Sequence, residues 1–314
     1  MNLPAPLPLR IAVLIPCFNE EAAIGQVVAD FRRALPGATI HVYDNNSTDR
    51  TVEVARAAGA FVGTETAQGK GHVVRRMFAD IDADVYLMVD GDATYDAASA
   101  PRLVERLVGE SMDMVVGSRT EMAREAYRKG HRFGNRLLTG AVRVLFGQRF
   151  TDILSGYRAF SRRFVKSFPA LSGGFEIETE LTVHALELSM PVAEVPTPYG
   201  ARPEGSASKL RTYADGLRIL RLIAALYRNE KPLQFFSILA GLLAAAAVAL
   251  SVPVFLTYFA TGLVPRFPTA ILCTGLMTVS ALGFTCGLIL DTVTRGRKEL
   301  KRLAYLAIPP VGRP

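Results

Sequence analysis

Short hydrophobic runs alternate with stretches of helical periodicity along the first 120 residues. The apolar, β-rich runs lie at residues 11–16, 39–44, 60–64, 85–89 and 114–118. Helices are predicted between the first four runs, at residues 22–35, 48–58 and from the Gly-rich segment 68–71 to about residue 81. Strands that alternate with helices are typical of a mostly parallel sheet covered by helices, so we expect an α/β domain.

Polar residues follow three of the predicted strands, at the point where each strand ends. They are Asn19 and Glu20, Asp44 and Asn45, and Asp90 and Asp92. Ligands of such sheets bind at the carboxyl ends of the strands, so we expect these side chains to line one pocket. The loop after the first strand is acidic and has no Gly-x-Gly-x-x-Gly, which disfavours a dinucleotide-binding Rossmann domain.

Two long, nearly uncharged runs lie near the C-terminus, at residues 233–263 and 270–290. About 20 apolar residues suffice to cross a bilayer as a helix. A helix in a soluble core is rarely apolar on every side, so two transmembrane helices are favoured over two buried ones.

The formal net charge of +7 by itself fits nucleic acid, acidic substrates or an anionic membrane surface. The basic residues gather beside the apolar runs, however: Arg228 and Lys231 precede the first, and five Lys or Arg residues follow the second between residues 295 and 302. The positive-inside rule therefore predicts a multi-pass protein of the cytoplasmic (inner) membrane, with residues 1–230 and the C-terminal tail in the cytoplasm. We expect a membrane and no nucleic acid as partner, and no signal peptide, because residues 1–9 are few and broken by Pro.

Two further segments, residues 132–149 and 210–227, combine apolar residues at helical spacing with several Arg residues. Basic amphipathic helices beside membrane spans can lie in the headgroup layer, and burial against the domain is the alternative. The interfacial position is favoured for the second segment and left open for the first. The expected organisation is a cytoplasmic domain at 1–209, an interfacial helix at 210–231, a two-helix transmembrane region at 232–292 and a basic tail at 293–314.

The sequence Asp90–Gly91–Asp92 places two carboxylates at the end of a hydrophobic strand. Hard oxygen ligands of this kind suit Mg²⁺ or Mn²⁺ that bridges the phosphates of a nucleotide sugar. An isolated Asp-x-Asp is more often a solvated turn. Here Asp44 and the Asn19–Glu20 loop add polar groups at the same edge of the sheet, and the combination favours a metal site.

Six motifs in this order resemble the inverting glycosyltransferases of glycosyltransferase family 2, which have the GT-A fold. They are Ile15–Glu20, Asp44–Asp49, Gln68–Gly71, Asp90–Asp92, Gly117–Arg119 and Asp152–Arg158. Within that family the chain resembles the dolichol-phosphate mannose synthase-like branch and the bacterial polyprenyl-phosphate glycosyltransferases, which share the two C-terminal apolar runs. The resemblance covers about residues 11–210 and implies a Rossmann-like, mostly parallel GT-A catalytic domain.

The resemblance also implies roles for single residues on the donor side. Nucleotide binding is implied for Pro16, Phe18, Glu20, Asp44, Lys70 and Asp90. Asp90 and Asp92 would bind Mg²⁺ or Mn²⁺, and Asp92 counts among the catalytic residues. Many relatives carry Gln where this chain has Thr94, so the third metal ligand, Thr94 or water, is left open.

On the acceptor side a lipid phosphate must approach a donor that is itself a diphosphate, which requires cations. The candidates are Arg119, Arg132, Arg202 and Lys209, and attraction to anionic headgroups is the alternative for each. The resemblance implies a position near the reacting centre for Asp152, which orients the acceptor, binds metal or holds the following loop. Asp152 and Arg119 are, with Asp92, the candidate catalytic residues. A phosphomonoester has its second pKa near 6, so a general base is dispensable.

Glu176 and Glu178 open a predicted helix that ends near residue 188. The helix dipole favours acids in a first turn, which explains both residues. A position of one of them in the pocket is left open.

We therefore expect a metal-dependent inverting transfer of a hexose from a nucleotide sugar to undecaprenyl or dolichyl phosphate. A UDP-sugar is the first choice of donor and GDP-mannose the second. One rival is a membrane glycosyltransferase with a glycolipid or polysaccharide hydroxyl acceptor, which would need a general base. The other is a non-catalytic adaptor that binds nucleotide sugars. A homo-oligomer is left open.

Overall fold

The computed structural model describes residues 9–120, 140, 142–143, 150–174, 176–200 and 212–311, with the backbone alone for 212–220. The chain divides into two units. The first comprises Met1–Ile219 together with Lys301–Pro314, and the second comprises Leu220–Leu300.

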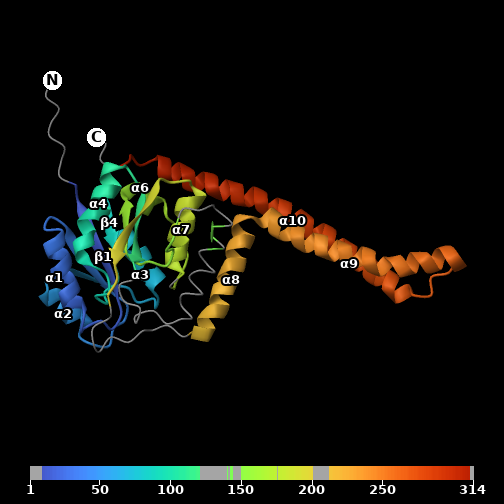
Figure 1. Cartoon of the computed structure of the whole chain (residues 1–314), viewed down its shortest axis with the longest axis horizontal. Coiled ribbons are helices and arrows are strands. Elements are labelled where there is room, and N and C mark those ends of the chain that lie inside the picture. The colour runs from blue at the N-terminus through green and yellow to red at the C-terminus, as the bar shows by residue number, and fades with distance from the viewer. Residues whose placement is uncertain are drawn as a thin grey trace, which may run out of the picture. The chain divides into compact units, whose positions relative to one another are not determined.

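Among the described residues, seven strands of the first unit form one mixed sheet in the order β3-β2-β1-β4-β6-β5-β7. Figure 1 labels β1 and β4 of this sheet. The strands are β1 Ile11–Cys17, β2 Thr39–Asp44, β3 Phe61–Thr64, β4 Val85–Met88, β5 Met114–Thr120, β6 Arg158–Ser161 and β7 Val192–Pro198. All pairs are parallel except those of β6, which runs antiparallel to β4 and β5. The sheet is therefore mostly parallel, as the sequence predicts.

Helices cover both faces of this sheet. They are α1 Ile24–Ala34, α2 Thr51–Ala57, α3 Lys70–Asp80, the short η1 Ala97–Ser99, α4 Ala100–Gly109, α6 Arg162–Ser167 and α7 Ile177–Glu187. Alternate residues of β1, Val13 and Ile15, share one core with Phe31 of α1 and Leu103 of α4. Strand β1 is buried along both faces, which accounts for its unbroken hydrophobic sequence.

The other face of the sheet carries an aromatic cluster. Phe78 of α3 makes edge-to-face contacts with Tyr86, Phe160 and Phe168, at centroid distances of 6.2, 5.8 and 6.1 Å. His184 of α7 lies edge-on to Phe164, with the two ring centroids 5.3 Å apart. Burial lowers the pKa of His184 to about 3, so this imidazole packs as a neutral ring. The cluster attaches α3, α6 and α7 to the sheet.

The five predicted strands are confirmed, with ends that shift by one or two residues. Two strands have no counterpart in the prediction. Strand β6 is only four residues long, and β7 contains Pro196 and Pro198, which are unfavourable inside a sheet. Strand β7 tolerates them because it lies at the edge of the sheet.

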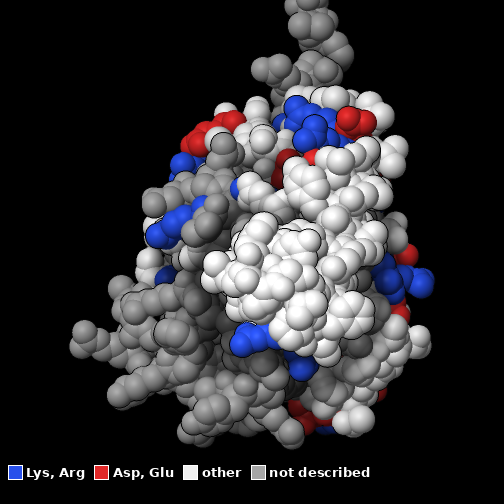
Figure 2. Space-filling view, turned by 90° about the vertical axis from the view of Figure 1, so that its right-hand side faces the viewer, with Lys and Arg blue, Asp and Glu red and all other residues white. Residues whose placement is uncertain are grey.

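Three helices follow, α8 Thr212–Glu230, α9 Pro232–Thr261 and α10 Phe267–Leu306. Helices α9 and α10 are long and apolar enough to cross a membrane. Their large apolar side chains, such as Phe259 and Leu282, are mostly exposed, unlike those of a buried core helix. Figure 2, seen from the end where α9 meets α10, shows a broad surface of uncharged side chains. Helix α10 also continues through much of the expected basic tail, because no Gly–Pro break follows the apolar run.

The C-terminal end of α10 packs into the first unit around Asp113, whose side chain is fully buried. The Asp113 carboxylate accepts hydrogen bonds from the Tyr305 hydroxyl at 2.8 Å, from the Ser161 hydroxyl at 2.7 Å and from the Arg163 guanidinium. Lys301 also pairs with buried Glu187 at 2.7 Å. Residues almost 200 positions apart therefore complete one buried polar cluster.

Removing the Tyr305 hydroxyl is expected to cost less than removing its acceptor. Tyr305→Phe loses one hydrogen bond, about 1 kcal/mol of unfolding free energy. Asp113→Ala leaves the largely buried Arg163 without its partner, about 3 kcal/mol. Denaturant unfolding followed by circular dichroism measures both values. The control is Tyr258→Phe in α9, where the residue is 48% exposed and stability should not change. Equal losses for Tyr305→Phe and Asp113→Ala would contradict this account of the cluster.

Candidate active site

The predicted donor-side residues meet at one edge of the sheet. Strand β1 lies between β2 and β4, and Cys17 at the end of β1 pairs with Asp44 at the end of β2. Pro16, Phe18 and Glu20 therefore lie beside Asp44, and Asp90 and Asp92 follow β4 at the same edge. The parallel register brings the ends of these three strands, and the loops that follow them, to one edge of the sheet.

The loops after β1 and β2 are joined by reciprocal hydrogen bonds. Asn19 has a φ of 53°. Its side-chain oxygen accepts from the Thr48 backbone amide at 2.8 Å, and its backbone amide donates to the Ser47 hydroxyl at 2.8 Å. The buried Asp44 carboxylate accepts from the Ser47 amide at 3.1 Å. The two loops are thus shaped before any ligand binds.

Asn45 connects the end of β2 to the segment that opens α3. Its side-chain amide donates to the carbonyls of Glu65 and Ala67 at 2.9 and 2.8 Å. Its side-chain oxygen accepts from the Gly69 amide at 2.7 Å. Only 3% of Asn45 is exposed, so its role is to hold the backbone of this segment in place.

Lys70, the first residue of α3, has its ammonium group between two carboxylates. Its Nζ contacts Asp90 Oδ1 and lies 2.6 Å from Glu178 Oε1. Burial alone would lower the pKa of Lys70, but the two carboxylates outweigh it and the pKa is raised above its ordinary value. Glu178, whose place in the first turn of α7 the helix dipole already explains, therefore also faces the site.

Glycines on either side of Lys70 let a second loop approach. A Cβ on Gly71 would lie 2.0 Å from the carbonyl oxygen of Ser172, and one on Gly69 2.1 Å from that of Gly173. Gly69 also has a φ of 133°, which L side chains rarely adopt. The sequence Gly69–Lys70–Gly71 thus fixes the Lys70 backbone against the loop before α7.

Asp90 and Asp92 have different surroundings. The side chain of Asp90 is 31% exposed and lies against Gly156, where a Cβ would come within 2.5 Å of Oδ2. Asp92 is buried, and its Oδ1 accepts hydrogen bonds from the Thr94 hydroxyl at 2.6 Å and the Thr94 amide at 3.2 Å. Thr94, an open candidate for metal ligation, orients Asp92.

Within the described ranges, no three His, Cys, Asp or Glu side chains converge as a metal site. Mg²⁺ commonly binds one or two protein carboxylates and takes its remaining ligands from water and substrate phosphates. Two carboxylates at a strand end, one partly exposed and one held by a hydroxyl, fit a divalent ion of this kind.

Arg119 and Asp152, both candidate catalytic residues, bind each other. Arg119 Nε and a terminal guanidinium nitrogen donate to the two Asp152 oxygens at 2.7 and 2.8 Å. The Arg119 guanidinium also lies 5.4 Å from the centre of the Tyr199 ring. Glu194 accepts from the backbone amides of Thr151 and Asp152 at 2.8 and 3.2 Å and so positions the carboxylate.

Arg158 holds the loop after Asp152 from inside the protein. It is fully buried, and its guanidinium donates to the carbonyls of Ser155 and Ile153 at 2.8 and 2.5 Å and to the Thr182 hydroxyl at 2.8 Å. Burial lowers the pKa of Arg158 to about 10, although the nearby Glu178 and Asp152 oppose this. The last residue of the Asp152–Arg158 motif therefore has a structural reason to be a cation.

The family model of glycosyl transferase family 2 matches residues 12–168, half of the chain. Glycosyltransferase AglJ of Haloferax volcanii is 38% identical over 233 residues, which cover 74% of this chain and 76% of that protein. The chain belongs to glycosyl transferase family 2. It is a glycosyltransferase, and the motifs that resemble this family are those that line the site.

Two further proteins are similar to this glycosyltransferase. The dolichyl-phosphate hexose transferase of Haloferax volcanii is 30% identical over 221 residues, which cover 70% of this chain and 95% of that protein. A crystal structure of glucosyl-3-phosphoglycerate synthase from Mycobacterium tuberculosis with Mn²⁺ and UDP-glucose superposes with a TM-score of 0.56 at 28% identity. It covers 70% of this chain and 78% of the synthase, and it confirms the expected GT-A fold.

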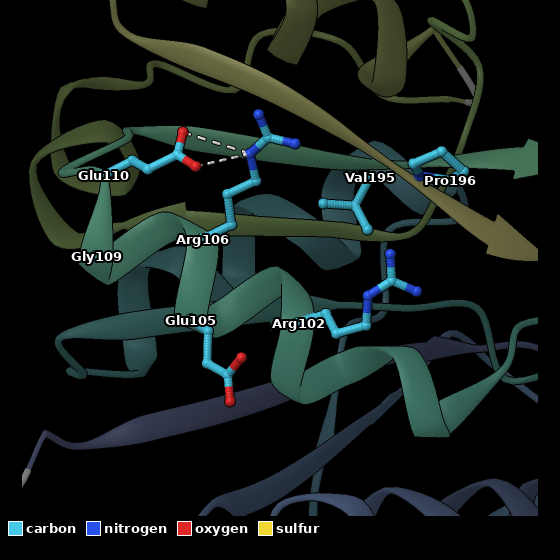
Figure 3. A pocket seen from close by; sticks show the side chains of 7 residues that line it. All are labelled: Arg102, Glu105, Arg106, Gly109, Glu110, Val195 and Pro196. Carbon is cyan, nitrogen blue, oxygen red and sulfur yellow. Dashed lines mark hydrogen bonds and ion pairs between the residues drawn. The ribbon is translucent and has the colours of Figure 1, made fainter.

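Three acceptor candidates, Arg132, Arg202 and Lys209, lie outside the described residues of the glycosyltransferase. A separate cavity of about 480 Å³ lies between α4 and β7 (Figure 3). It is lined by Arg102, Glu105, Arg106, Gly109, Glu110, Val195 and Pro196, none of which is a predicted site residue. Arg106 is already paired with Glu110 at 3.3 Å.

Two Gly→Ala substitutions should change the stability of the glycosyltransferase in opposite directions. In Gly71→Ala the new methyl group meets the Ser172 carbonyl, and the resulting shift costs about 1–3 kcal/mol of unfolding free energy. In Gly109→Ala, in α4, the methyl group meets open space, and stability should rise by up to about 1 kcal/mol. Chemical denaturation of both variants measures the difference. A gain in Gly71→Ala would refute the close contact with Ser172.

Proposed function

We propose that this glycosyltransferase transfers a hexose from a nucleotide sugar, preferentially a UDP-sugar, to undecaprenyl or dolichyl phosphate. The proposal includes inversion at the anomeric carbon and dependence on Mg²⁺ or Mn²⁺. On the donor side it is supported by the similarity to a synthase crystallised with Mn²⁺ and UDP-glucose. On the acceptor side it is supported by the relative named dolichyl-phosphate hexose transferase.

In this proposal the donor binds across the aligned strand ends. The nucleoside is contacted by Pro16 and Asp44 at the ends of β1 and β2, and by Phe18 and Glu20 in the loop after β1. Asp90 and Asp92 hold the divalent ion, which, when bound, would neutralise the charge that develops on the leaving diphosphate. Lys70 supplies a further cation beside Asp90. The hydrogen-bonded loops reduce the cost of ordering the site when the donor binds.

The Arg119–Asp152 ion pair is the observation that carries the choice of a phosphate acceptor. A hydroxyl acceptor needs a base to take its proton, whereas both Asp152 oxygens are engaged by one guanidinium. A lipid phosphate has largely lost its second proton at neutral pH and needs no base. We therefore assign Asp152 to the orientation of Arg119, and Arg119 to the acceptor phosphate, together with Arg132, Arg202 and Lys209.

The reaction is then a single displacement. An acceptor phosphate oxygen forms a bond to the anomeric carbon of the sugar as the bond from that carbon to the diphosphate oxygen breaks. The nucleoside diphosphate leaves with the electron pair, and no proton is transferred. The protein contributes proximity and fixed charges.

The helices α9 and α10 support a membrane location for such an acceptor, since each could span a bilayer. The Lys and Arg residues that flank them favour a catalytic domain on the cytoplasmic side of the cytoplasmic membrane. The polyprenyl headgroup lies at that surface. A glycosyltransferase with a hydroxyl acceptor is the alternative that the following experiments can distinguish.

The first experiment measures transfer from radiolabelled UDP- and GDP-sugars to undecaprenyl phosphate by the full chain in detergent with Mg²⁺ or Mn²⁺. We expect an organic-extractable product whose rate of formation falls at least about 100-fold in Asp92→Asn, because a metal ligand is lost. Asp82→Asn removes an equally charged carboxylate from the surface and should keep the full rate. Binding of UDP without transfer to undecaprenyl phosphate would favour a different acceptor.

A second experiment tests whether Asp152 acts as a base. We expect Asp152→Asn to lower the rate about tenfold, since the amide positions Arg119 less well, and to leave the shape of the pH–rate profile unchanged. Loss of a general base would instead cost about 10²–10⁴-fold and remove one limb of the profile. That second result would favour a hydroxyl acceptor.

A further inference from the structure

The buried ammonium group of Lys70 occupies an oxygen of Asp90, the same carboxylate that the proposed function assigns to the divalent ion. The Lys70 side chain is only 10% exposed, so water cannot replace a lost partner at little cost. A divalent ion that binds Asp90 must therefore compete with Lys70 and leave that ammonium a partner.

Glu178 is placed to be that partner. Its Oε1 lies 2.6 Å from Lys70 Nζ. Of the two carboxylates that contact this ammonium, Glu178 is the more deeply buried. The Glu178 side chain is 6% exposed and the Asp90 side chain 31%, so Asp90 is the carboxylate that incoming ligands reach.

The backbone restricts how far Lys70 can move. Asn45 holds the Gly69 amide, and the Gly71 amide donates to the Gly173 carbonyl at 3.2 Å. Any change in the ammonium position must come from rotation of the Lys70 side chain between its two carboxylates. Glu178 is itself part of α7, and its backbone carbonyl accepts from Thr182, which also binds the buried Arg158. The backbone that carries the Glu178 carboxylate is therefore held in place by buried hydrogen bonds.

We propose that Lys70 is an internal cation that occupies Asp90 before the divalent ion binds, and that Glu178 is the positioning residue that retains the Lys70 ammonium when Asp90 binds the ion. Lys70 then stays charged beside the bound diphosphate and no longer contacts a carboxylate of the metal site. Without the Glu178 charge the ammonium has only Asp90, and it competes more strongly with the ion.

This inference rests on the proposed metal site, and Mn²⁺ affinity tests it without any turnover. The full chain in detergent is titrated with Mn²⁺, and free Mn²⁺ is followed by electron paramagnetic resonance. We expect Glu178→Gln to raise the Kd for Mn²⁺ roughly tenfold, since one partner of a buried charge is lost. Lys70→Met should lower that Kd, because Asp90 is then unoccupied.

A double-mutant cycle separates this role from a general electrostatic or structural effect of Glu178. In the Lys70→Met background, Glu178→Gln should change the Kd less than about threefold, because the ammonium that it positions is gone. The exposed Glu105→Gln is the charge-matched control and should bind Mn²⁺ as the original chain does. Circular dichroism verifies that each variant is folded.

Equal effects of Glu178→Gln in both backgrounds would overturn the inference, as would an unchanged Kd. If Glu178→Gln does not fold, Lys70→Met alone still decides, because an unchanged or raised Kd for Mn²⁺ contradicts occupation of Asp90 by Lys70. The original chain could transfer sugar and bind Mn²⁺ while Lys70→Met and Glu178→Gln show no coupling in the cycle. That result would refute only this inference. Absence of both would refute the proposed function as well.

Discussion

The parallel pairing of β1 with β2 on one side and β4 on the other is the constraint on which the site depends. A shift by one residue would move every side chain of β1 to the opposite face of the sheet and remove Val13 and Ile15 from the core that they share with α1 and α4. This register sets Asp44 opposite Cys17 and brings Asp90 to the same edge. The hydrophobic packing of the strands therefore sets the distances between the loops that follow them.

Charge pairing is the second constraint, because the site is assembled from ionic groups with little exposure. Arg119 is matched by Asp152, and Lys70 by Asp90 and Glu178. Arg158 is matched by backbone carbonyls, whose dipoles stabilise a cation without adding a further carboxylate. Each pair fixes a loop or a helix start, so the electrostatics of the site and the geometry of its backbone cannot be altered independently.

Local patterns in the sequence predict part of the fold and of the site. Hydrophobic runs mark the strand ends and the acids that follow them, so the sequence predicts Asp44, Asp90 and Asp92 at one edge. Contacts between distant residues leave no local pattern. Lys70 and Glu178 are 108 positions apart, and the dipole of α7 explained Glu178 equally well. The prolines of β7 argue against a strand in the sequence, because Pro is tolerated in a sheet mainly at its edge, where β7 lies.

The discontinuity of the first unit has a consequence for how this protein is made. Asp113 and Glu187 are synthesised early, but their partners Tyr305 and Lys301 leave the ribosome only after the whole of α9 and most of α10. The buried contacts of Asp113 with Tyr305 and of Glu187 with Lys301 can therefore form only after both apolar helices have been synthesised. A fragment cut before α9 would retain the strand ends yet expose two carboxylates that the native fold buries.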